Sequence, residues 1–347
     1  PEASTTPISS SPTASPGATP IPSQTPGPTP GPLDTGLKQV TDMAVADDYE
    51  GALRLLADLR EKFPTDPRVN DEMEKVAAKL EASLNEQVLS PDQLDHLAAP
   101  LQTAALAGSR SAQMLLASAY RQSNPQEAFK YYLLAADDQD GHGNSAAMLE
   151  VGNMFASGVG TDKNEESALQ WFQKAAAKGE AGALYAVGEF YFFGRGGLKP
   201  DPKMAIHYLT QAAGYNDPRA QNLLGDIYRK GIGLDHKNFA EAYRLFSQAS
   251  AAGFLDAQGN LGVMIANGEV PDKPADIKAA TELFRKGAEA GNALCMFFYA
   301  KVLEKGLGLP APDKDSARTW YERAAKAGQQ QAKAKCEEEG WNFEEVQ

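Results

Sequence analysis

Small and bulky apolar residues follow one another along the chain with a helical spacing, and the pattern recurs at a fixed interval. In the stretch 147–179, the small residue Ala168 is followed by Trp171 and Phe172 three and four positions later, and by Ala176 after eight. Residues with these separations lie on one face of an α-helix. The same order of small, bulky and small residues starts again at Ala205, Ala242, Ala280 and Ala317. The pattern predicts five copies of one helix.

A partner helix precedes each copy and carries a glycine, with a second glycine six residues later. These pairs are Gly152/Gly158, Gly188/Gly194, Gly225/Gly231 and Gly262/Gly268, with Ala300/Gly306 as a variant. A period of roughly 20–50 residues is typical of stacked helical or strand units that bury a continuous core between neighbours. No segment has a convincing strand pattern. The sequence therefore predicts an all-α fold, in which helix pairs stack into an α/α superhelical solenoid.

Four dipeptides mark further helix starts, each a capping residue followed by proline: Ser90-Pro91, Asn124-Pro125, Asp201-Pro202 and Asp217-Pro218. The side chain of the first residue accepts a free backbone N–H group, and proline lacks a donor that would have no partner there. We expect helices joined by short turns over the whole region.

Three regions are predicted. Residues 1–33 hold ten of the 22 prolines and predict a disordered Pro/Ser/Thr-rich linker, with a proline-motif ligand for a partner domain as the alternative. Residues 34–89 predict a helical segment. Residues 90–347 predict the repeat solenoid of about six units and a C-terminal capping helix. The first unit is degenerate, because Ala128, Tyr131 and Ala136 repeat the helix pattern without the glycine loop.

Composition narrows the possible functions. The formal charge of −13 and the lack of a dense Lys/Arg cluster argue against a nucleic-acid partner. No apolar run is long enough to insert into a membrane. The two cysteines cannot build a disulfide framework, although one bridge between them stays possible. Cys295 occupies a position that is alanine in the other repeats, which indicates a small buried thiol.

We find no motif that carries chemistry, and we predict no catalytic residue, no metal site and no cofactor. The Gly-x-Gly steps follow helices instead of strands, so we interpret them as helix ends and not as phosphate loops. The acidic loop 137–145 has Leu149 where a calcium loop needs a bidentate glutamate. It is expected to be a solvated loop, with a non-standard cation site as the alternative. The four histidines are widely separated.

The repeats resemble the Sel1-like repeat family, which is related to tetratricopeptide repeats. The family pattern is shown well by Ala220, Gly225, Tyr228, Gly231, Ala242, Phe246, Ala249 and Gly253. The segment with Tyr49, Ala52 and Pro64 is similar to the second half of one tetratricopeptide repeat. The resemblance implies an α/α superhelix in a family of adaptors in signalling and envelope processes. It names no partner.

A variable stripe on the first helices is the candidate binding surface. Counting the leading small residue of each first helix as position 1, positions 3, 7 and 10 share a face and differ in character between repeats. Variation where packing does not fix identity is expected of a partner-facing stripe, although a solvated face would look similar. Exposed aromatic residues tend to anchor interfaces, and their burial inside the superhelix is the alternative. The candidate residues are Asn153, Tyr185, Glu189, Phe192, Asn222, Asp226, Arg229, Val263, Phe297 and Lys301.

Three functions are considered. The preferred hypothesis is a non-enzymatic adaptor that binds a peptide or protein in the concave groove of the superhelix. Because the chain begins with Pro1 instead of Met, we expect a fragment or a processed product. The second hypothesis is therefore an accessory module of a larger signalling enzyme, such as a membrane-tethered kinase. A hydrolase within the repeats has the least support. The compartment is left open, with a bacterial envelope location, tethered through the linker, as the preferred expectation.

Overall fold

The computed structural model describes residues 30–84, 87–139 and 141–344, and every regular element in these ranges is an α-helix. The predicted all-α solenoid is confirmed. Most of the predicted linker 1–33 lies outside the described residues, and the first helix begins at Pro32, so its first two residues fall within that predicted linker. The N-terminal helices are α1 (Pro32–Val45), α2 (Tyr49–Lys62), α3 (Pro67–Ser83), α4 (Pro91–Leu106), α5 (Arg110–Ser123) and α6 (Pro125–Ala136).

The remaining helices form five pairs and a final single helix. We call the odd-numbered member of each pair the first helix and the even-numbered member the second helix. The pairs are α7 (Ser145–Ser157) with α8 (Glu165–Ala177), α9 (Ala181–Phe193) with α10 (Pro202–Gly214), α11 (Pro218–Lys230) with α12 (Phe239–Ala251), α13 (Leu255–Asn267) with α14 (Ile277–Glu289), and α15 (Ala293–Lys305) with α16 (Lys314–Lys326), followed by α17 (Gln330–Glu339).

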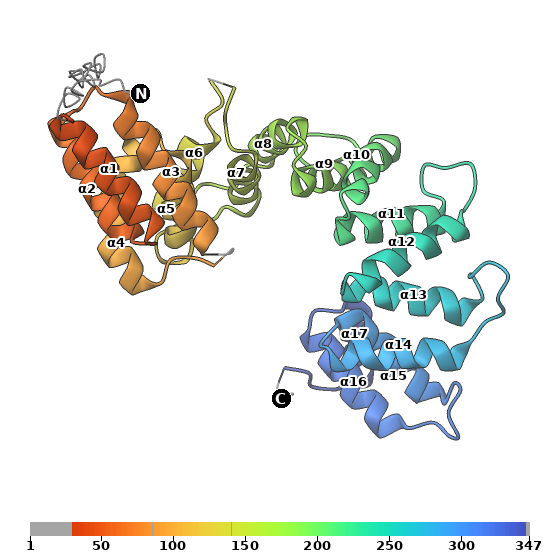
Figure 1. Ribbon diagram of the computed structural model, residues 1–347. Helices are drawn as coiled ribbons and strands as arrows, with labels where there is room; N and C mark the ends of the chain where they lie inside the picture. Colours follow the sequence, from red (N-terminus) through yellow and green to blue (C-terminus); the bar gives the residue numbers. More distant parts are fainter. Residues whose placement is uncertain (1–29, 85–86, 140, 345–347) are drawn as a thin grey trace, which may run out of the picture.

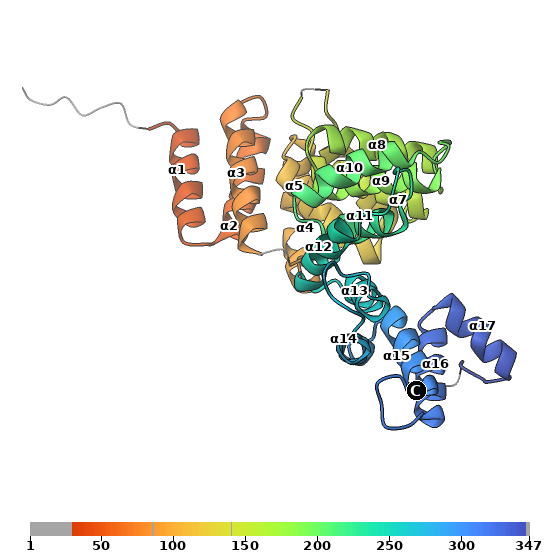
Figure 2. The same ribbon diagram turned by 90° about the vertical axis from the view of Figure 1, so that its right-hand side faces the viewer.

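The helices follow one another around a wide arc (Figure 1). The N-terminal helices form a group at one end, and the units from α11 to α17 turn away from them at the other end. In the view turned by 90°, helices α1 to α3 stand apart from the central units, and the last units descend away from the stack (Figure 2). The core is a series of neighbouring apolar clusters along this arc, as expected when each repeat packs mainly on its neighbours.

The predicted helix starts are confirmed at all four dipeptides. Ser90, Asn124, Asp201 and Asp217 are N-caps whose side chains accept backbone N–H groups, and proline occupies the first turn of each helix. At Ser90 the cap is reciprocal, because the Gln93 side chain accepts the Ser90 N–H group in return.

The first glycine of each Gly/Gly pair, such as Gly152 of Gly152/Gly158, brings the two helices of a unit into close contact. A Cβ atom added to Gly152 would lie 2.5 Å from the ring of Phe172, and one added to Gly262 would lie 2.6 Å from the ring of Phe284. These distances are far below van der Waals contact, so only glycine allows the rings to pack so closely against the first helix. The second glycine ends the helix: Gly158 and its four counterparts are C-caps with a left-handed backbone, which favours glycine.

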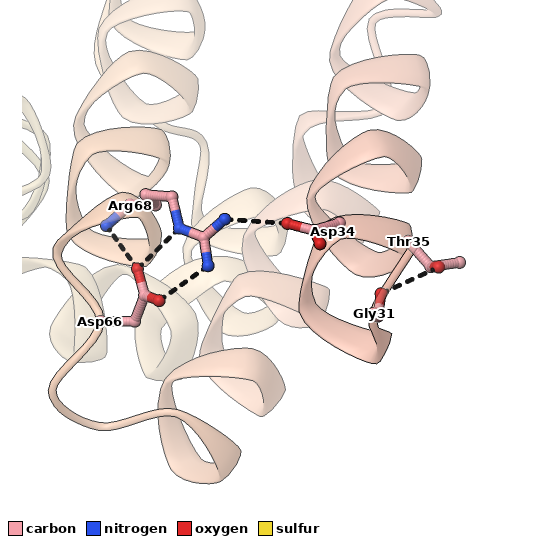
Figure 3. Close-up of polar contacts among 5 residues, drawn as sticks. All are labelled: Gly31, Asp34, Thr35, Asp66 and Arg68. Carbon is pink, nitrogen blue, oxygen red and sulfur yellow. Dashed lines mark hydrogen bonds and ion pairs between the residues drawn. The ribbon is translucent and has the colours of Figure 1, made fainter. Parts of the chain in front are cut away.

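An arginine joins the first and third helices near the start of the described chain. The Arg68 guanidinium donates to the Asp66 carboxylate, the N-cap of α3, and its other arm reaches Asp34 on α1 at 2.8 Å (Figure 3). On the same first turn of α1, the Thr35 hydroxyl donates to the Gly31 carbonyl. The hydrogen bonds from Arg68 hold the pKa of Asp66 below its usual range. Because Arg68 and Asp34 are half exposed, the pair orients the helices and adds little stability.

The C-terminal helix α17 packs against α16 and buries Ala332 and Cys336 completely. Beyond the helix, the Trp341 ring lies 6.2 Å from the Tyr321 ring of α16. The last unit therefore does not leave its apolar face open, which is the role predicted for a capping helix. Both cysteines are free and buried, as predicted for Cys295.

Substitution of Gly152 by alanine should destabilise the protein by about 1–3 kcal/mol, because the added methyl group collides with the Phe172 ring. The matched control is Gly214→Ala at the end of α10, where an added Cβ meets no atom within 4 Å. This control should be neutral or stabilising by at most about 1 kcal/mol. Urea unfolding of both variants measures the difference, and equal stabilities would contradict the close-contact explanation.

The thiols should resist modification in the folded protein. Burial raises the pKa of Cys295 to about 12 and also raises the pKa of Cys336. The thiolate is the reactive form, so it is scarce at pH 8 and becomes more abundant as the pH rises towards the pKa. We expect reaction of the native chain with Ellman's reagent at pH 8 to be on the order of 100-fold slower than reaction of the urea-unfolded chain. Rapid modification of both thiols without unfolding would disprove their burial.

Candidate binding surface

From α11 to α15, successive first helices lie closer to one another than successive second helices do. Helix α11 contacts α13, and α13 contacts α15. Among the described pairs, successive second helices do not contact each other as extensively. A stack whose first helices lie closer together curves towards them, so these helices form the inner side of the arc. We call the face that carries positions 3, 7 and 10 of the first helices the inner face. The candidate residues from the sequence occupy these positions of the first helices.

Tyr185 lies between two neighbouring first helices. Its ring is covered by the guanidinium of Arg219 at the start of α11, with the carbon of that group 4.7 Å from the ring centroid. Its hydroxyl donates to Glu189 at 3.2 Å. Burial, followed by the negative charge of Glu189, raises the pKa of Tyr185, so the phenol is neutral at physiological pH. Arg219 is held in turn by Asp217, the N-cap of α11. Tyr185 is therefore half-buried in a polar contact between repeats.

Three other candidates also make polar contacts along the inner face. Asn222 accepts a hydrogen bond from Asn260 of the next first helix at 2.9 Å. Arg229 pairs with Glu269 after α13 at 2.6 Å, and both side chains are about one-fifth exposed. Asp226 pairs with Lys230 of its own helix, where Lys230 is largely exposed. Arg229 is thus paired with a residue of a neighbouring repeat, whereas Asp226 is paired with an exposed lysine of its own helix.

Glu189 belongs to a second charged group on the inner face. Besides accepting from Tyr185, it lies 3.7 Å from Arg195, which also pairs with Glu165 at 2.9 Å. The hydrogen bond from Arg195 lowers the pKa of Glu165. Each of these three charged side chains is about one-third exposed. Lys163, 3.3 Å from Glu165, supplies the second positive charge that balances the two carboxylates.

The aromatic candidates differ in accessibility. Phe192 is half-buried and meets the exposed ring of Phe193 edge-on at 4.9 Å. Phe297 instead belongs to the core: it is 7% exposed and packs edge-on against Tyr321. The expectation of an exposed aromatic anchor at Phe297 is corrected accordingly. The reason is local, because the last unit has α17 and a following segment against it and closes around its aromatic residues.

Asn153 lines a hollow at the junction between the N-terminal helices and the first complete pair. This α4–α7 pocket has a volume of about 820 Å³. Its N-terminal wall includes Leu89, Leu94 and Gln122, and its other wall includes Asn153 and Val159. The N-terminal wall could not be found from the repeat pattern, because these residues lie outside the five regular pairs.

Val263 and Lys301 line a second, smaller hollow of about 210 Å³ between two successive first helices, which we call the α13–α15 pocket. Its wall also includes Ala266 and Asn267 of α13, and its floor is formed by Phe284 of α14. These two candidates, at the same position of consecutive repeats, are thus brought together. Lys305, one turn after Lys301, lines it as well and was missed. Extending the stripe by one turn would have found it.

The other sites considered from sequence have simple surroundings. In the loop after α6, Asp138 pairs with Lys178 at 2.9 Å and accepts the Gly143 N–H group at 2.7 Å; position 140 is outside the described residues. Within the described ranges, no three potential ligand side chains gather in a way that could hold a metal ion. None of the helices described here combines the length and apolar character needed to cross a bilayer.

Curated relatives align with parts of this chain. The ERAD-associated E3 ubiquitin-protein ligase component HRD3A of Arabidopsis thaliana is 41% identical over 69 residues, which is 20% of this chain and 10% of the plant protein. Chitin synthase regulatory factor 2 of Schizosaccharomyces pombe is 27% identical over 212 residues, which is 58% of this chain and 40% of the yeast protein. The chain thus spans less than half the length of either relative.

A solved structure and a family model agree with the architecture. The Sel1 repeat protein from Oxalobacter formigenes is 29% identical and superposes with a TM-score of 0.55, covering 66% of this chain and 84% of that protein. The Sel1 repeat model matches residues 110–140, 145–180, 181–214, 218–254, 255–292 and 293–329. These segments coincide with the helix pairs from α5 and α6 to α15 and α16 and make up more than half of the sequence. The chain therefore belongs to the Sel1 repeat family.

Proposed function

We propose that this protein is a non-enzymatic adaptor that binds a peptide or protein segment along the inner face of its superhelix. The observation that carries the proposal is the contrast between the two kinds of helix position. Residues that pack the units repeat from one pair to the next, whereas positions 3, 7 and 10 of the first helices vary. Position 7, for example, is occupied in successive first helices by Asn153, Glu189, Asp226, Val263 and Lys301. A continuous surface with locally different chemistry suits recognition of an extended partner.

The state of the side chains also supports binding on a surface that is formed in advance. Tyr185, Asn222 and Arg229 are each fixed by a contact to the neighbouring repeat. Side chains that are already ordered lose less conformational entropy when a partner binds. Aromatic and arginine side chains are also the residue types that most often dominate binding energy.

The relatives support only the general role. One is named as a component of a ubiquitin ligase and the other as a regulatory factor of chitin synthase. From these relatives we propose only that the chain acts together with another protein. We do not propose that its partner is a ubiquitin ligase or chitin synthase. The predicted organisation, with residues 1–33 as a linker, residues 34–89 as a tetratricopeptide-like segment and residues 90–347 as the repeat array, is retained as part of this proposal.

A random peptide library displayed on phage and selected against the full chain tests the inner face. We expect selected peptides to bind the triple variant Tyr185→Ala/Phe192→Ala/Asp226→Ala about 30-fold or more weakly, because truncating interface anchors costs about 2 kcal/mol or more. Isothermal titration calorimetry measures the affinities, and thermal unfolding monitors the fold.

The matched control replaces exposed residues of three second helices, Gln170→Ala/Thr210→Ala/Gln248→Ala. Its affinity should equal that of the unmodified chain. Binding that is lost in this control and retained in the triple variant would place the binding surface on the outer helices and refute the proposal.

A further inference from the structure

The α13–α15 pocket is apolar inside. Phe284 at its floor is 2% exposed and Ala280 beside it 1%, and the two belong to one core cluster with Val302. Ile277 and the exposed side chain of Leu307 complete the apolar lining. A hollow of about 210 Å³ is below the ~300–1,000 Å³ of pockets that enclose drug-sized ligands. It has the size for a single bulky side chain.

The pocket is open because two residues of α13 are small. Position 10 of this helix is Ala266, whereas α9 has Phe192 and α11 has Arg229 at the same position. Position 7 is Val263, whereas α9 and α11 have Glu189 and Asp226. In those two helices Glu189, Asp226 and Arg229 form ion pairs along the inner face, and Phe192 packs against Phe193. The α13–α15 interval therefore offers an apolar recess beside a polar surface.

Two lysines stand at the edge of this recess without a carboxylate partner. Lys301 and Lys305 are one helical turn apart on α15, and within the described residues neither forms an ion pair with an acidic side chain. The acidic residue between them, Glu304, is engaged elsewhere, by the Tyr321 hydroxyl at 2.9 Å and by Lys335 at 3.4 Å. The Lys301 ammonium group lies over the ring of Phe298, 5.7 Å from its centroid, so it is held close to the apolar lining.

The nearby acidic residues do not change this picture. Glu269, after α13, pairs with Arg229, and Glu282 on α14 pairs with Arg285. Asp276 caps the start of α14 by accepting the Ala279 N–H group. In a chain of net charge −13, Lys301 and Lys305 therefore form a local positive site that no acidic side chain of the described residues neutralises.

We infer that the α13–α15 pocket receives one apolar side chain of an acidic peptide, whose carboxylates on either side of that residue pair with Lys301 and Lys305. This inference rests on the proposed binding along the inner face and adds the class of partner. The net charge alone would favour a basic partner. However, charges farther away than about 8 Å are largely screened at physiological ionic strength, so the two lysines decide the local preference.

Four fluorescein-labelled decapeptides provide the probe, each with Leu, Ile, Val or Phe between two pairs of aspartates in a Gly/Ser background. Fluorescence anisotropy with the full chain should show saturable binding of at least one of them. Replacing its apolar residue by alanine, or its aspartates by lysines, should weaken binding about tenfold or more. Affinity should also fall as salt is raised. Absence of saturable binding by all four would overturn the inference.

Charge reversal identifies the lysines. Lys301→Glu/Lys305→Glu should bind the acidic peptide about tenfold or more weakly and should gain binding to the peptide that carries lysines. That gain also proves that the variant is folded. The matched control Lys199→Glu/Lys203→Glu changes the net charge equally at exposed positions and should not alter the affinity measured at 150 mM salt. Equal effects of the two double variants would overturn the inference.

Filling the recess identifies the pocket. Ala266→Phe reproduces the residue that α9 carries at this position and should abolish binding of the acidic peptide. The matched control Ala156→Phe, at the same position of α7, should leave it unchanged. If phage-selected peptides depend on Tyr185, Phe192 and Asp226 while the acidic peptide ignores Ala266→Phe, the inference fails and the proposed function stands.

Discussion

The rest of the structure depends on the contact between a glycine of the first helix and a bulky side chain of the second helix in four of the five units, α15 having Ala300 instead. At Gly152, Gly225 and Gly262 a phenylalanine ring lies where a Cβ atom would otherwise be. This contact sets how closely the two helices of a unit can pack, and its recurrence gives consecutive units the same geometry. The glycine six residues later has a left-handed backbone conformation and ends the first helix at the same position of each unit.

Because glycine and ring fix the packing, the remaining face of the first helix is free to vary. The contacts on that face differ in chemistry from one interval to the next. Tyr185 and Arg219 form a ring–guanidinium contact, Asn222 and Asn260 an amide pair, and Arg229 and Glu269 an ion pair. Each lies between neighbouring repeats. The inner face can therefore change in charge and shape along one unchanged scaffold.

Sequence reasoning predicted the scaffold well because its rules are local. Proline caps such as Asp201-Pro202 and glycine ends such as Gly231 act within one helical turn, and the glycine end recurs in all five pairs. The inner face was predicted only as a stripe. Its pairings join residues about 40 positions apart, such as Arg229 with Glu269, so they depend on the geometry of stacking. The burial of Phe297 likewise follows from the closing of the last unit, a feature that the internal repeats do not have.

A hollow in such a solenoid arises where the variable residues are small. Helices α13 and α15 are in closer contact than α11 and α13, but the small residues at positions 7 and 10 do not fill the space between them. Val263 and Ala266 therefore leave a recess, although Phe284 still packs tightly behind them. Within this family, binding sites can accordingly be sought where a variable position loses bulk and a charge beside it has no partner.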